Sequence, residues 1–328
     1  MSEAHLLQDI FTRRFHYVRL SITDKCNFRC QYCLPNGYEC KSPQKSLSLS
    51  EINHLLAALV ELGIQKIRLT GGEPLLRKDL VAIIKTIKQY PQINSIALTT
   101  NAYKLHHILD ECIDAGLTHL NISVDSLDED NFAYITGSNK LKTILNTIDY
   151  ALGSSLQQVK INTVLLKNTF AELGQFLSLI KKQPLDIRFI ELMETGDNQP
   201  FFQENYLAAH ILQDELLAQN WQAVMAPENS GPAKMFAHPE YNGKIGIIAP
   251  YSKDFCTNCN RLRFTHLGAL RLCLFGDDSF SLRHLMQDTT QKEDLKSAII
   301  NLLVNKPKQH LLSKNIHGDV INFSQIGG

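Results

Sequence analysis

No run of about eighteen apolar residues occurs anywhere in the 328-residue chain, so the sequence predicts no membrane-spanning helix. The first ~20 residues carry several charged side chains and no apolar run of signal-peptide length. Lys+Arg and Asp+Glu both number 33, so no net charge attracts nucleic acid or an anionic membrane surface. We therefore expect a cytoplasmic protein in which locally placed basic residues bind any anionic ligand.

The two common phosphate-binding loops are also absent, since neither G-x-x-x-x-G-K-S/T nor G-x-G-x-x-G occurs. A disulfide framework is not expected either, because the chain is long and carries no secretion signal. Eight cysteines then need another explanation. Cys40 and Cys112 stand alone and are interpreted as ordinary free thiols. The other six form two tight clusters, which in a reducing compartment indicates metal binding: Cys26, Cys30 and Cys33, and Cys256, Cys259 and Cys273.

Up to about residue 195, short strand-like runs alternate with amphipathic helical stretches. The strands are expected at Tyr17–Ile22, Lys66–Thr70, Ser95–Asn101, His119–Asp125, Val159–Leu166 and Asp186–Leu192. Helices are expected at Ser50–Leu62, Asp79–Tyr90 and Leu105–Ala115, with Ser50 as an N-cap and Gly63 and Gly116 as C-terminal stops. Six βα repeats predict an α/β protein with a parallel sheet.

The two faces of these strands favour a barrel over a doubly wound parallel sheet. Each strand alternates a polar and an apolar face, whereas parallel strands buried on both faces read as continuous apolar runs. A solvent-facing antiparallel sheet also alternates, but it does not fit the intervening helices. We therefore predict an incomplete (β/α)6, TIM-like barrel around a polar, ligand-filled cavity. Five basic residues face that cavity and would repel one another unless a polyanion is bound: Arg19, Lys66, Arg68, Lys160 and Arg188.

Beyond residue 195 the pattern changes, and we predict two regions, 1–195 and 196–328, the second closing the open side of the barrel. A loop at Thr195–Gln199 is expected to lead to a helix at Tyr206–Gln219. Short strands are predicted at Trp221–Met225, Lys234–Ala237 and Lys244–Ile248. A hairpin is predicted at Arg261–Thr265 and Ala269–Leu274, and a helix at Glu293–Val304.

The first cysteine cluster reads C-x3-C-x2-C and follows the first strand, at the end where barrel enzymes place their chemistry. Three thiolates can hold three irons of a cubane cluster and leave the fourth iron open, whereas a structural zinc site needs a fourth protein ligand. This motif resembles the radical S-adenosylmethionine (SAM) superfamily. The resemblance implies that Gly71-Gly72-Glu73-Pro74 binds the amino group of SAM. It also implies that Tyr32, Ser123 and Met193 contact SAM.

The second group of cysteines consists of a C-x2-C motif and Cys273 further along the chain. It could hold a second iron–sulfur cluster, or a zinc ion with His266 as the fourth ligand. Between its cysteines lies Arg261-Leu262-Arg263. An Arg-x-Arg pair is usually a solvated face, but beside an open cluster iron it suggests a clamp for a phosphorylated substrate.

Together these residues resemble the GTP 3′,8-cyclase family of molybdenum cofactor biosynthesis nearly end to end. One departure is Thr99-Thr-Asn-Ala102, where the family usually has glycine last; alanine has poorer access to positive φ. The segments that carry the resemblance are Arg19-Leu-Ser-Ile-Thr-Asp24, the first cysteine motif, Arg68-Leu-Thr-Gly-Gly-Glu-Pro74, Ser123-Val-Asp-Ser126, Lys160-Ile-Asn-Thr163, Arg188-Phe-Ile-Glu-Leu-Met193, Asp254-Phe-Cys-Thr-Asn-Cys-Asn-Arg-Leu-Arg263 and Gly327-Gly328.

The resemblance implies two 4Fe–4S clusters and SAM as cofactors, and GTP as substrate. The deoxyadenosyl radical would take hydrogen from C3′ of GTP, and closure onto C8 would give 3′,8-cyclo-7,8-dihydro-GTP. A companion synthase would then convert the product to cyclic pyranopterin monophosphate. The second cluster would hold the guanine, and the residues implied to position the ribose and triphosphate are Arg19, Arg68, Thr99, Lys160, Arg261, Leu262 and Arg263.

Two other interpretations stay open from the residues. One is a peptide-modifying radical SAM maturase with two clusters, which would bind a protein substrate and not GTP. The other is a non-catalytic iron–sulfur electron carrier, which would have no use for a cation-lined lumen. A homodimer is also left open.

Overall fold

The computed structural model describes residues 7–39, 44–225, 231–276, 278–314, 316, 318 and 320–324. Cys40 and the terminal Gly327–Gly328 lie outside these residues. Within the described part of the chain, no helix is long and apolar enough to cross a membrane.

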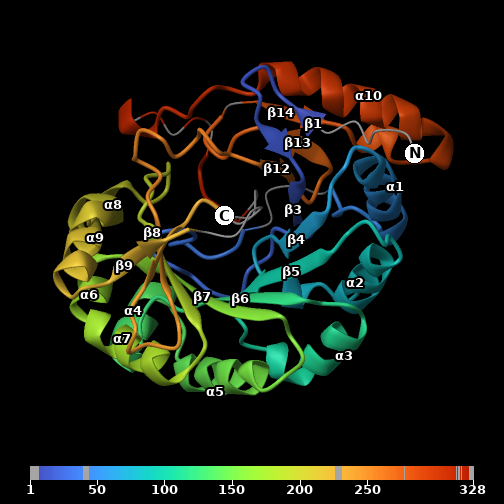
Figure 1. Ribbon diagram of the computed structural model, residues 1–328. Coiled ribbons are helices and arrows are strands. Elements are labelled where there is room, and N and C mark those ends of the chain that lie inside the picture. Colours follow the sequence, from blue (N-terminus) through green and yellow to red (C-terminus); the bar gives the residue numbers. More distant parts are fainter. Residues whose placement is uncertain are drawn as a thin grey trace.

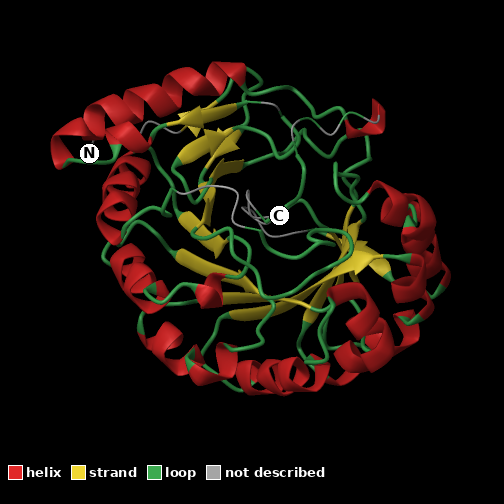
Figure 2. Cartoon of the chain, turned by 180° about the vertical axis from the view of Figure 1, so that it is seen from behind, coloured by secondary structure: helices red, strands yellow, loops and turns green. Residues whose placement is uncertain are grey.

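Six parallel strands, in chain order, form the centre of a curled sheet with helices on its outer face (Figures 1 and 2). The strands are β3 (Tyr17–Ser21), β4 (Lys66–Thr70), β5 (Ser95–Thr100), β6 (His119–Ser123), β7 (Gln158–Leu165) and β8 (Asp186–Glu191). The helices between them are α1 (Leu49–Glu61), α2 (Leu80–Lys88), α3 (Leu109–Asp114), α4 (Glu129–Thr136), α5 (Leu141–Leu152), α6 (Lys167–Ala171) and α7 (Leu173–Lys182). The predicted α/β, incomplete (β/α)6 barrel is confirmed.

The C-terminal region extends both edges of this sheet to twelve strands, in the order β14-β13-β12-β3-β4-β5-β6-β7-β8-β11-β10-β9. Strand β12 pairs with β3 and strand β11 with β8, both in parallel. The added elements are α8 (Gln199–Asn205), α9 (Ala209–Ala218), β9 (Gln222–Val224), β10 (Lys234–Ala237), β11 (Ile245–Ile248), β12 (Arg261–Phe264), β13 (Ala269–Arg271), β14 (Ser279–Ser281) and α10 (Lys292–Leu302). A separate small ribbon joins β1 (Leu7–Gln8) to β2 (Arg14–Phe15).

Several element boundaries differ from the sequence predictions. Helix α1 begins earlier than expected, at Leu49, because its N-cap is Ser48, two residues before the predicted Ser50. Ser48 accepts a hydrogen bond from the Glu51 backbone, and the Glu51 carboxylate accepts one from Ser48 N, which completes a capping box. The loop predicted at Thr195–Gln199 is followed by helix α8, which the sequence analysis did not predict. The helix expected at Tyr206–Gln219 is the shorter helix α9, which begins at Ala209. The helix expected at Leu105–Ala115 is a 3-10 turn followed by α3.

Apolar side chains of the parallel strands pack outward against the helices. Val18, Ile67 and Ile96 are adjacent in register and buried, as are Ile122, Ile161 and Ile187 further along. Because facing residues of paired strands share a face, the alternate positions form the inner wall. Basic residues occupy a row across that wall: Arg271, Arg263, Arg19 and Arg68 are neighbours on β13, β12, β3 and β4.

Candidate active site

The first cysteine motif lies in the loop after β3. Cys33 N donates to Cys30 O at 2.9 Å and closes a tight turn. Arg29 N and Gln31 N donate to the last carbonyls of helix α4, those of Thr136 and Ile135. The loop is therefore fixed by backbone hydrogen bonds on the inside of the barrel mouth.

The two glycines after β4 allow the backbone to lie directly against this loop. Gly72 N donates to Thr23 O at 2.9 Å. A Cβ on Gly71 would stand 2.2 Å from Thr23 O, and one on Gly72 would stand 2.2 Å from Lys25 O. Both contacts are with backbone atoms, so no side-chain adjustment could relieve them. Only glycine permits this approach.

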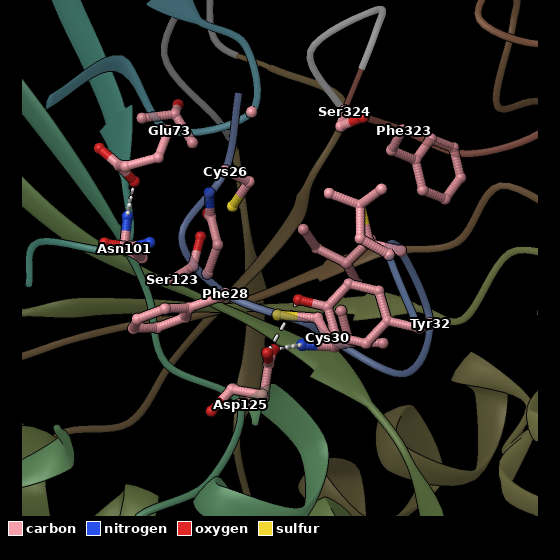
Figure 3. Close-up of a pocket in the computed structure, with 18 of the residues that line it drawn as sticks. Cys26, Phe28, Cys30, Tyr32, Glu73, Asn101, Ser123, Asp125, Phe323 and Ser324 are labelled. Carbon is pink, nitrogen blue, oxygen red and sulfur yellow. Dashed lines mark hydrogen bonds between the residues drawn. The ribbon is translucent and has the colours of Figure 1, made fainter. Parts of the chain in front are cut away.

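Glu73 joins the glycine turn to the end of β5 (Figure 3). Its carboxylate accepts hydrogen bonds from the Thr100 hydroxyl at 2.6 Å and from Asn101 N at 2.7 Å. Burial raises the pKa of Glu73 to about 7, against the opposing effect of these hydrogen bonds. Next in the chain, Ala102 adopts φ 58°, the left-handed conformation that glycine would take more readily. The alanine at this position therefore takes a backbone conformation that favours glycine.

A cavity of about 1120 Å³ opens above this loop. The four residues expected to contact SAM all line it: Tyr32, Gly72, Ser123 and Met193. Thr99 lines it as well, as do the three cysteines. Its mixture of apolar and convergent polar groups suits a small-molecule ligand.

Sequence reasoning missed Asp125, which lies on the floor of this cavity. Its carboxylate accepts a hydrogen bond from the Tyr32 hydroxyl at 2.8 Å and one from Val164 N at 2.9 Å (Figure 3). Burial raises the pKa of Asp125 to about 6. This contact ties the aromatic ring of Tyr32 to the barrel wall. The sequence offered one indication of this role: Asp125 stands two positions beyond Ser123, at the end of the same predicted strand, and has a side chain that can form hydrogen bonds.

The second cysteine motif faces a neighbouring cavity of about 890 Å³. Four arginines and the three cysteines line it: Arg13, Arg19, Arg261, Arg263, Cys256, Cys259 and Cys273. His310 lines it too, with its ring 5.5 Å from that of Phe275. His266, the histidine expected in the zinc alternative, instead has its Nε2 3.7 Å from an Asp24 oxygen. The histidine at this cavity is therefore His310.

Two buried cations that the sequence did not single out support the second motif. Arg13 donates to three backbone carbonyls, those of Cys256, Pro307 and Lys308, and pairs with Asp9 at 2.6 Å. The Lys306 ammonium donates to Leu272 O. Burial alone would raise the pKa of the Cys259 thiol, but Arg261, Lys306 and Arg13 lower it to about 7.

Burial raises the pKa of the thiols at the first cysteine site and of Cys256 at the second, in contrast to Cys259. Burial, together with Glu73, raises the pKa of Cys26 to about 11. Burial and the neighbouring Cys26 raise that of Cys33 to about 12. These thiols would be protonated when no metal is bound, so metal binding there must release protons.

The two cysteine motifs offer three thiols each. Ligands of one zinc ion converge on one point. Among the described residues, no group of three or more donors does so, although all six cysteines are included. Three thiolates are a donor set that fits a cubane cluster with one open iron, because each thiolate then binds a different iron.

The two cavities are neighbours and share three lining residues, Asn162, Ile190 and Met193. Arg68 and Lys160 lie on the inner wall, beside Arg19 and Asn121 in register. The side chain of Leu262 belongs to the hydrophobic core, so it faces away from the lumen.

Comparison with known proteins agrees with this arrangement. The model of the radical SAM superfamily matches residues 20–180, and the molybdenum cofactor synthesis C-terminal model matches residues 185–312. The GTP 3′,8-cyclase of Pectobacterium atrosepticum is 47% identical over 325 residues, which cover 98% of this chain and 99% of that one. The GTP 3′,8-cyclase of Tolumonas auensis is 46% identical over 324 residues, covering 98% and 96%.

Solved structures share the fold at low identity. Streptococcus suis SuiB bound to S-adenosylmethionine aligns with TM-score 0.62 and 13% identity over 86% of this chain and 68% of that one. The enzyme anSMEcpe with AdoMet and a peptide aligns with TM-score 0.55 and 12% identity over 88% and 83%. The near full-length identity to the two cyclases identifies the family. This chain belongs to the GTP 3′,8-cyclase family of the radical S-adenosylmethionine superfamily.

Proposed function

We propose that this chain binds GTP across its two neighbouring cavities and cyclises it between C3′ and C8, the first step of molybdenum cofactor biosynthesis. One observation carries the proposal: two three-cysteine sites face neighbouring cavities that share three lining residues, with a row of arginines beside them. An electron carrier has no need of such a lumen. The 47% identity to a cyclase favours the cyclase over a peptide-modifying maturase.

The first cavity fits SAM. Cys26, Cys30 and Cys33 would hold a 4Fe–4S cluster whose open iron chelates the methionine part of the cofactor. When bound, the cluster and SAM supply a 5′-deoxyadenosyl radical. The chain itself orients the cofactor: Tyr32 is held by Asp125, and Ser123 and Met193 line the same cavity. The apolar lining keeps water away from the reacting carbon.

The second cavity fits GTP. Arg19, Arg261 and Arg263 present guanidinium groups, which match phosphate oxygens in bidentate pairs. Arg68, Lys160 and Thr99 extend the contacts along the inner wall. A second 4Fe–4S cluster on Cys256, Cys259 and Cys273 would take the guanine at its open iron. The ribose would then lie at the lining residues that the two cavities share, facing the first cavity.

Further parts of the proposal rest on chemistry alone. The product needs a companion synthase that rearranges it into cyclic pyranopterin monophosphate. Oxygen-sensitive clusters on reduced cysteines suit the cytoplasm. We also retain the division into regions 1–195 and 196–328, and a homodimer stays open as the assembly.

Anaerobic reconstitution tests the proposal. Two clusters give about eight irons per chain, and replacing Cys26, Cys30 and Cys33 with alanine should leave about four and abolish SAM cleavage. Replacing Cys112, which is buried and lines neither cavity, is the matched control and should leave the iron count unchanged. Zinc at the second site, or SAM cleavage without any change in GTP, would contradict the proposal.

A further inference from the structure

Tyr17 lies at the centre of the cationic wall, at a position that the proposed mechanism does not use. It is 2% exposed and is the first residue of β3. In register, Arg261 of β12 stands on one side of it and Lys66 of β4 on the other. One step along the same face, Arg263, Arg19 and Arg68 form the next row. Five cations thus surround one phenol.

Individual contacts agree with this placement. Arg19 Nε donates to the Tyr17 hydroxyl at 3.4 Å. The Lys66 ammonium lies 5.2 Å and the Arg68 guanidinium 5.7 Å from the centre of the tyrosine ring. The Nε atoms of Arg68 and Arg188 are buried without a hydrogen-bond partner, so part of the cationic wall still needs an acceptor.

Few acidic groups face this wall. Asp186 on β8 acts on Lys160 and Arg188. Tyr17, when ionised, acts on Lys66, Arg68, Arg188 and Arg263. The charged and titratable groups that act on Tyr17 or on its cationic neighbours include Arg19, Lys66, Arg68, His119, Lys160, Asp186, Arg188, Cys259, Arg261 and Arg263, and the carboxyl groups of Glu73, Asp125 and Glu191 line the first cavity. With cations in such excess, an ionised phenol is favoured when no substrate is bound.

We propose that Tyr17 is an exchangeable counter-ion: its phenolate balances the wall in the empty enzyme and takes up a proton when a polyphosphate binds. The proposal rests on the proposed function, because GTP supplies the polyphosphate. The phosphate oxygens replace the phenolate as partners of the arginines. The phenolate oxygen then forms an O–H bond with a proton from the buffer, and no electrons are exchanged.

The direction of the pH effect follows from this exchange. Burial would raise the pKa of Tyr17, but Arg68, Arg19 and Lys66 lower it to about 7. A bound polyanion cancels that influence and returns the pKa toward the ordinary value of about 10. Between about pH 7 and about pH 10, the complex with the polyanion therefore holds one proton more than the free enzyme. GTP affinity should fall as pH rises above about 7, by up to about tenfold per pH unit.

Lys160 contributes in the same direction. Burial, and then Arg188, lower its pKa to about 6, so it too gains a proton when an anion binds. Tyr17 is not among the groups that shift the pKa of Lys160, so the contribution of Lys160 should be the same in a Tyr17 variant as in the natural enzyme. The difference between the two proteins therefore reports Tyr17, together with its effect on the pKa of Lys66.

Calorimetric titration of the anaerobically reconstituted enzyme with GTP, in two buffers of different ionisation enthalpy, measures the proton uptake. At pH 8.5 the natural enzyme should take up about one proton more than Tyr17→Phe. Tyr17→Phe should bind GTP about thirtyfold more tightly than the natural enzyme at that pH, and about equally at pH 6.5. Tyr90→Phe is the control, because its hydroxyl donates to Asn53 and lies outside the lumen; it should match the natural enzyme.

Inorganic triphosphate serves as a second probe, since it carries the phosphates without the base. Equal proton uptake by the natural enzyme and Tyr17→Phe, with GTP still bound, would overturn the role of Tyr17 and leave the proposed function intact. If the natural enzyme does not bind GTP, the proposed function fails. The triphosphate titration then decides: unequal uptake supports the exchange, and equal uptake overturns it.

Discussion

Replacing Arg13 with methionine should loosen the second cysteine site and destabilise the whole chain. The guanidinium donates to Asp9 at 2.6 Å and to the carbonyls of Pro307, Lys308 and Cys256 at 2.8, 3.0 and 3.2 Å. It therefore joins the N-terminal ribbon, the cysteine loop and the segment after α10. Methionine keeps an apolar stem of similar length but leaves Asp9 buried without a cation.

Removing one partner of a buried ion pair costs about 3–5 kcal/mol. The lost carbonyl contacts belong to the same network, so their cost is included and not added. Arg14→Met is the matched control, because the neighbouring Arg14 is exposed; it should change stability by less than about 0.5 kcal/mol.

Urea unfolding without oxygen, followed by circular dichroism, measures the free energy of unfolding, and iron analysis reports the second site. We expect iron to fall from about eight toward about four per chain in Arg13→Met only. A loss of stability and iron no larger than that of Arg14→Met would refute the role of Arg13.

Three further predictions follow from particular contacts. Gly72→Ala should abolish SAM cleavage and remove the iron of the first site, because its Cβ would stand 2.2 Å from Lys25 O. Gly174→Ala is the control: its Cβ would have nothing within 4 Å, and the substitution should stabilise helix α7 by about 0.5–1 kcal/mol. Equal iron contents in the two variants would contradict the argument. Burial raises the pKa of Glu51, but hydrogen bonds from Arg283 and Gln287 lower it to about 2. Its stabilising effect is therefore full above about pH 4.5 and lost as pH falls toward about 2. Glu51→Gln should cost about 1–2 kcal/mol at pH 7, after allowing for solvent screening, and nothing near pH 2 in acid unfolding. Arg263→Ala should weaken GTP binding about ten- to a hundredfold in calorimetry while SAM cleavage without substrate persists; unchanged affinity would show that Arg263 does not contact the phosphates.

Strand faces and clustered cysteines could be predicted from the sequence because both follow from short-range patterns. The period-two alternation placed Arg19 and Arg68 on one face, and the spacing of Cys26, Cys30 and Cys33 fixed their common loop. The cap of α1 was misplaced because Ser48 and Ser50 are both good caps. Only the position of Glu51, three residues after Ser48, separates them.

Other features depend on long-range pairing and were missed for that reason. The contacts of Arg13 join residues more than 240 positions apart, and no local pattern indicates them. The surroundings of Tyr17 arise from the register of β12 and β4 on either side of β3. His266 looked like a ligand because it stands near Cys273 in the sequence, yet the chain brings His310 to the second cavity.

The central claim is that the neighbouring cavities present one ribose carbon of GTP to the SAM pocket. Position alone should then select one C–H bond, because hydrogen transfer requires near-contact and alignment. GTP carrying deuterium at C3′ should pass it into 5′-deoxyadenosine, as detected by mass spectrometry of an anaerobic reaction. Deuterium at C2′ or C4′ should remain in the nucleotide. Label that arrives from another ribose carbon, or none from C3′ while SAM is cleaved, would contradict the assignment of this chain as a GTP 3′,8-cyclase.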